Sequence, residues 1–82
     1  MTKSRYIIRA REEPVALAAL ADFRASLPAS PEIELVDTIG PADRPHTLVV
    51  DVAPEQALAL EQRFRNSQHL MIERDRPLSL FL

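Results

Sequence analysis

Two carboxylates near the end of the sequence, Glu73 and Asp75, have the spacing best suited to a chemical role. They stand two positions apart, and in an extended segment that spacing projects both side chains to the same side. Such a pair can accept hydrogen bonds from the unpaired amides at helix N-termini of a partner, where the helix dipole also favours negative charge. The alternative is a solubilising pair balanced by the neighbouring Arg74 and Arg76.

The residues that follow these acids, 77–82, form an apolar segment that begins with proline. Proline prevents helix and favours an extended backbone, which is the form that a protease cleft binds by strand addition. Because a terminus frays unless something covers it, either the segment folds back on the domain or another protein receives it. We expect the second, with a single domain at 1–76 and an extended tail of Pro77, Leu78, Ser79, Leu80, Phe81 and Leu82.

Other kinds of site find little support in the sequence. His46 and His69 are far apart and lack an acid-rich ligand set, so we expect ordinary histidines and no metal site. No serine, histidine and acid are spaced for nucleophilic catalysis. The loop 10–14 has no glycine and contains two acids, which disfavours a phosphate cradle. We therefore expect a protein that is not an enzyme and that uses no cofactor.

Length, composition and charge argue against several further classes of function. The chain has 82 residues, no cysteine and a formal net charge of −2, which predicts one domain without disulfides. The negative charge and the shortage of strand aromatics argue against nucleic acid as a partner. No apolar run is long enough to span a membrane or to act as a secretory signal, so we expect a cytoplasmic protein that binds no membrane.

Alternating and helical periodicities predict six elements. Alternation of apolar and polar residues indicates strands at 5–11, 32–39, 46–52 and 69–73. Apolar residues at three- and four-residue spacing indicate helices at 15–27 and 53–65, each with proline and acid near its start. Gly40, the only glycine, stands in the turn between two strands, where a positive φ is needed.

The order β-α-β-β-α-β is that of an α+β, ferredoxin-like domain, a four-stranded antiparallel sheet with two helices on one face. The residues expected in its core share apolar character and inward phase: Tyr6, Ile8, Leu20, Phe23, Leu27, Ile33, Leu35, Leu48, Val50, Val52, Leu60, Phe64, Leu70 and Ile72.

The sheet face that the helices leave open has apolar members of its own. Alternation assigns Ile7, Val36, Val49 and Met71 to it, interspersed with charged residues. Because a face that meets only water is usually polar, we interpret these four as a docking patch. Scattered apolar residues on a sheet surface are the alternative.

The chain resembles the inhibitor-type pro-domains of subtilisin-like serine proteases and their free-standing relatives. The resemblance covers nearly the whole chain: the opening Arg5-Tyr6-Ile7-Ile8, the element order, and above all Met71-Ile72-Glu73-Arg74-Asp75, which looks like the family's last strand. It implies that the open sheet face packs on two helices of a protease, that Glu73 and Asp75 cap those helices, and that the tail enters the cleft like a substrate.

The resemblance also implies a register for the tail. Phe81 would fill the primary specificity pocket and Leu78 the distal apolar pocket; in the alternative register Leu82 and Ser79 take those places. The first is preferred, because an apolar side chain suits an apolar pocket. The implied role is that of an inhibitor or a folding chaperone of the protease.

A second hypothesis assigns the chain a different kind of function. Ferredoxin-like domains also pair into dimers that bind a small regulatory ligand, and residues 77–82 alternate well enough to add a strand to a neighbouring copy.

Overall fold

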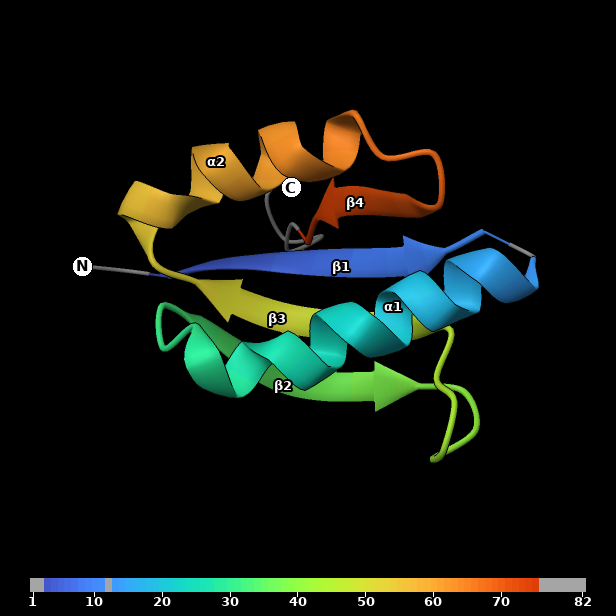
Figure 1. The fold of residues 1–82 in the computed structure, drawn as a ribbon. Coiled ribbons are helices and arrows are strands. Elements are labelled where there is room, and N and C mark those ends of the chain that lie inside the picture. The colour runs from blue at the N-terminus through green and yellow to red at the C-terminus, as the bar shows by residue number, and fades with distance from the viewer. Residues whose placement is uncertain (1–2, 12, 76–82) are drawn as a thin grey trace, which may run out of the picture.

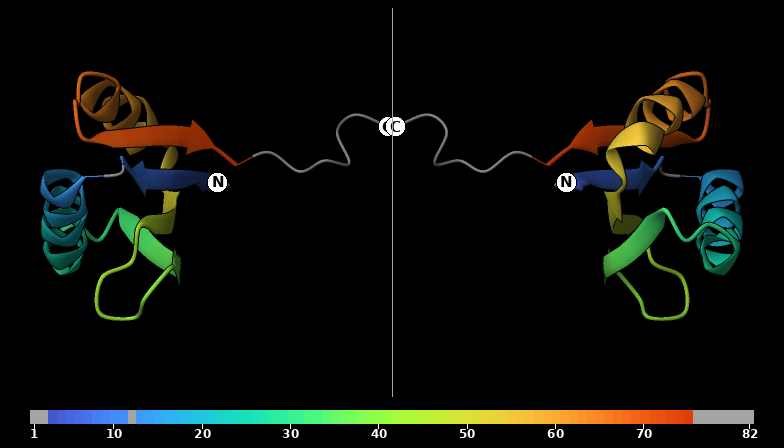
Figure 2. Two further views of the ribbon diagram at one scale, coloured as in Figure 1. Left: turned by 90° about the vertical axis from the view of Figure 1, so that its right-hand side faces the viewer. Right: turned by 90° about the vertical axis from the view of Figure 1, so that its left-hand side faces the viewer.

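The computed structural model describes residues 3–11 and 13–75. It confirms the predicted order: β1 (Ser4–Ala10), α1 (Pro14–Ser26), a short 3-10 helix (Leu27–Ala29), β2 (Ile33–Ile39), β3 (Thr47–Val52), α2 (Pro54–Arg65) and β4 (Leu70–Arg74). The four strands form one antiparallel sheet in the order β2-β3-β1-β4 (Figure 1). Both helices lie on the same side of that sheet (Figure 2), so the fold is ferredoxin-like.

Local sequence explains where the helices begin and end. Pro14 and Pro54 open α1 and α2, where a missing N–H removes no hydrogen bond. Glu55 lies in the first turn of α2, and Arg63 and Arg65 in its last, which is the charge order that the helix dipole favours. Pro28 stops α1 and turns the chain into the 3-10 helix.

The core lies between the helices and the covered sheet face. Tyr6, Ile8, Leu48, Val50 and Val52 are completely buried there, and all belong to the two central strands. The rest of the core comes from the ends of β1 and β4, from both helices and from the 3-10 helix: Ala10, Leu70, Ala16, Leu20, Phe23, Ala57, Leu60, Phe64 and Leu27.

Three aromatic residues join the elements of this core. Phe23 and Phe64 meet edge to face with ring centroids 5.0 Å apart, which joins α1 to α2. The hydroxyl of Tyr6 donates a 2.7 Å hydrogen bond to the Glu61 carboxylate and so joins β1 to α2. Burial of the Tyr6 hydroxyl, together with this bond to Glu61, raises its pKa above the ordinary value for tyrosine.

The core prediction is wrong at one position. Leu35 is 36% exposed because β2 is an edge strand that the helices cover incompletely. Ile33 and Ile72, both on edge strands, are partly buried against the core.

Gly40 has the predicted positive φ, at 111°. An added Cβ at this position would lie 2.6 Å from Cδ2 of His46, so glycine is required both by its backbone and by the ring beside it.

Candidate docking face

The strand register fixes which side chains share the open face. Residues that pair across the strands lie side by side, and those out of phase with the buried core residues face away from the helices. Going from β2 to β4, this open face has three rows: Glu34, Asp51, Arg5 and Asp75; then Asp37, Val49, Ile7 and Glu73; then Ile39, Thr47, Arg9 and Met71.

The structure places three of the four expected docking residues together. Ile7 pairs with Val49 in the middle of the sheet, and Met71 lies one row away on β4. All three are partly buried, so each still presents apolar surface to solvent. Ile39, which the sequence reasoning did not assign to this face, occupies the other end of Met71's row.

Val36 occupies a different setting from the other three. The register of β2 against β3 shifts between Leu35 and Asp37, so Val36 is the extra residue of a bulge and has no partner on β3. Asp37, and not Val36, pairs with Val49. Val36 is 40% exposed on this edge strand.

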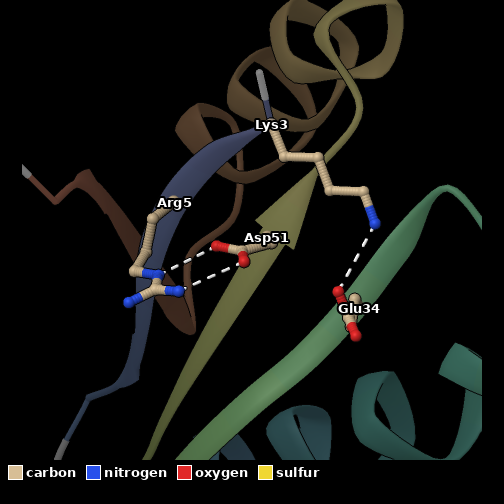
Figure 3. A network of polar contacts seen from close by, with 4 residues as sticks. All are labelled: Lys3, Arg5, Glu34 and Asp51. Atoms are coloured by element: carbon tan, nitrogen blue, oxygen red, sulfur yellow. Dashed lines mark hydrogen bonds and ion pairs between the residues drawn. The ribbon is translucent and has the colours of Figure 1, made fainter. Parts of the chain in front are cut away.

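Ion pairs neutralise two acids of the first row, Glu34 on β2 and Asp51 on β3. Arg5 donates from Nε and Nη2 to both oxygens of Asp51, at 2.9 and 3.2 Å, and Lys3 reaches Oε1 of Glu34 at 3.4 Å (Figure 3). The hydrogen bond from Arg5 holds the pKa of Asp51 below its usual range. Sequence reasoning missed this bidentate pair because β1 and β3 are 46 positions apart and only their register brings Arg5 opposite Asp51.

The two predicted capping acids lie on the opposite edge, on the same open face. Glu73 pairs with Ile7, and the N–H of Asp75 donates to the carbonyl of Arg5 at 2.9 Å, which extends the ladder one residue past β4. Both residues are exposed. Within the described part of the chain neither carboxylate enters a side-chain hydrogen bond or an ion pair.

Arg74, which stands between the two acids, points to the covered side. Its guanidinium carbon lies 5.7 Å from the ring centroid of Tyr6, and its Nη2 donates to the Ser4 hydroxyl at 3.3 Å. This cation therefore packs on the core and not beside Glu73. Its contacts hold the end of β4 against β1, which fixes the position of the acids.

The two histidines do not converge. Nδ1 of His46 is 2.8 Å from the hydroxyl of Thr47, whereas Nδ1 of His69 is 3.7 Å from a carboxylate oxygen of Glu13. The part of the chain that the structure describes contains no group of three or more side chains able to hold a metal ion. It also contains no helix with the length and hydropathy to cross a bilayer.

The expected cleft-binding residues, 77–82, lie outside the described residues, as does Arg76. Comparison of the chain with protein-family models, with curated proteins and with solved structures gave no match.

Proposed function

We propose that this protein is a propeptide-like inhibitor of a subtilisin-like serine protease, and that it docks through its open sheet face. The observation that carries the proposal is the pair of Glu73 and Asp75, exposed on that face and without a partner in the described part of the chain, beside the apolar pair Ile7 and Val49. Residues 77–82 then enter the active-site cleft as an extended, substrate-like strand.

The apolar pair supports docking because it lies in the centre of the face. Ile7 and Val49 are neighbours on the two middle strands, flanked by acids on both edges and continued by Met71 and Ile39 in the next row. A small apolar centre with a polar rim is the usual anatomy of a protein interface.

The acids support a partner with helix N-termini at the contact. A carboxylate that has no internal partner accepts hydrogen bonds from free helix amides without giving up an existing bond. Among the other acids of this face, Glu34 and Asp51 already have Lys3 and Arg5. Asp37 accepts the N–H of Thr38 at 2.8 Å, so the β4 edge is where a partner's donors gain most.

The sequence supports the choice of protease as the partner. Residues 71–75 resemble the last strand of the inhibitor-type pro-domains. The resemblance implies that Glu73 and Asp75 cap the helices and, in the preferred register, that Phe81 fills the primary pocket and Leu78 the distal pocket. A domain that binds only the folded protease also stabilises it by mass action, so the same contact serves a folding chaperone.

The experiment is inhibition of a broad-specificity subtilisin by the full chain and by a chain ending at Asp75. We expect the full chain to inhibit the protease. The shortened chain should no longer inhibit it, but should retain weaker binding through the sheet face. Absence of inhibition by the full chain would contradict the proposal.

A second candidate is a self-associating module with a regulatory or small-ligand-binding role. The observation in its favour is the edge strand β2, which carries three of the five large hydrophobic residues exposed in the described ranges: Leu35, Val36 and Ile39. An exposed apolar edge pairs readily with an added strand, and residues 77–82 of a second copy would supply one. A dimer in sedimentation that becomes a monomer when the chain ends at Asp75, without protease inhibition, favours this candidate.

A further inference from the structure

A second surface of the molecule has the shape and charge of a small-molecule site. A groove of about 750 Å³ lies where the end of β1, the start of α1 and the β2–β3 loop meet, and it extends onto the open face beside Ile7 and Thr47. Its volume is within the usual range for ligand pockets.

The walls of the groove are mostly apolar. They come from segments far apart in sequence, with Ile7 and Ala10 on β1, Pro14 and Leu17 on α1, and Ile39 at the end of β2. Ile39 is 46% exposed, so an apolar ligand that covered it would remove much of that surface from water.

The polar groups of the groove are mainly cationic. Arg9 and Arg11 both line it and enter no ion pair within the described ranges, although the chain as a whole has a net charge of −2. Glu13 is the one acid among the described lining residues, and its carboxylate lies 3.7 Å from Nδ1 of His69. Two arginines beside an apolar wall complement a molecule with one negative end and one apolar body.

His46 completes the groove and is held in place from two sides. Its Nδ1 contacts the hydroxyl of Thr47, a side chain that is buried with 3% exposure. Its ring also packs so closely on Gly40 that a Cβ there would collide with it. His46 and Thr47 both line the groove beside Ile39.

We infer that this groove binds a small amphipathic carboxylate, with its apolar body along Ile7, Leu17 and Ile39 and its carboxylate at Arg9 and Arg11. The inference does not rest on the proposed protease partner, although the groove shares four residues with the open face: Ile7, Arg9, Ile39 and Thr47. Binding of such a ligand would therefore compete with docking on this end of the open face.

Decanoate, kept below its micelle concentration, is the probe, and 1-decanol is its uncharged counterpart. In two-dimensional NMR of the ¹⁵N-labelled full chain, we expect decanoate to shift the amides of the groove residues and to bind at least tenfold more tightly than decanol. Arg9→Gln and Arg11→Gln should each weaken decanoate about fivefold, because each removes a charge-assisted contact in a partly solvated site.

Arg24→Gln, on α1 away from the groove, is the control that should leave the affinity unchanged. Equal affinity for decanoate and decanol, or shifts that spread to Leu58 on α2 as strongly as to Ile39, would overturn the inference. So would an absence of binding, or an equal loss of affinity in the control variant.

Discussion

The two faces of the sheet differ in what their side chains contact. On the covered face Tyr6, Ile8 and Val50 are completely buried against the two helices. On the open face the residues next to them, Ile7 and Val49, are only partly buried and lie among charged neighbours. Alternate residues of one strand therefore meet different surroundings, since the period of two sends one set into the core and the other to the open face.

The largest difference in stability between the two faces is expected for two neighbouring isoleucines on β1, Ile7 and Ile8. Ile8→Ala removes a fully buried side chain and should lower the free energy of unfolding by about 3 kcal/mol, whereas Ile7→Ala should cost about 1 kcal/mol or less. Urea denaturation of both variants measures this. Equal losses would mean that the open face is part of the core.

A smaller effect is expected where β1 bonds to α2. Tyr6→Phe keeps the buried ring but removes the 2.7 Å hydrogen bond to Glu61. It should lower the free energy of unfolding by about 1.5 kcal/mol, at the lower end of the range for hydrogen bonds to charged groups. Glu61→Gln, which can still accept from Tyr6, should cost less in the same denaturation experiment. A Tyr6→Phe variant as stable as the original chain would contradict a structural role for this bond.

The smallest effect concerns Asp51 on the open face and its dependence on pH. Because its folded pKa is lowered by Arg5, the pair stabilises the fold above the ordinary carboxylate pKa of about 3.9, and that stabilisation is lost as the pH falls through the lowered pKa. The stability gap between the original chain and Asp51→Asn should therefore shrink from pH 5 to pH 2. Asp22→Asn, which removes an exposed carboxylate on α1, is the control expected to show little gap at any pH.

Periodicity in the sequence is enough to predict this fold and most of its core. Alternation located all four strands, and the prolines at 14 and 54 located the helix starts, because these are local properties of the backbone. The predicted positive φ at Gly40 is confirmed for the same reason. The exposure of Leu35 could not be predicted, since it depends on how far the helices reach over an edge strand.

The open face was less predictable than the core. The bulge around Val36 gives no signal in the residue types, and one inserted residue changes every assignment that follows on β2. It put Asp37 opposite Val49 and added Ile39 to the face. The Arg5–Asp51 pair required a register that only the folded sheet provides, and the groove required three distant segments to meet.

The most direct test of docking through the open face compares its two acidic edges. We would measure binding of the full chain to a subtilisin whose catalytic serine is replaced by alanine, using Glu73→Gln/Asp75→Asn and, with the same charge change on β2, Glu34→Gln/Asp37→Asn. If the β4 acids bind the protease, the β4 double variant should bind at least tenfold more weakly, while the β2 double variant should bind about as well as the original chain. Equal weakening by both variants, or no binding by the original chain, would contradict this docking.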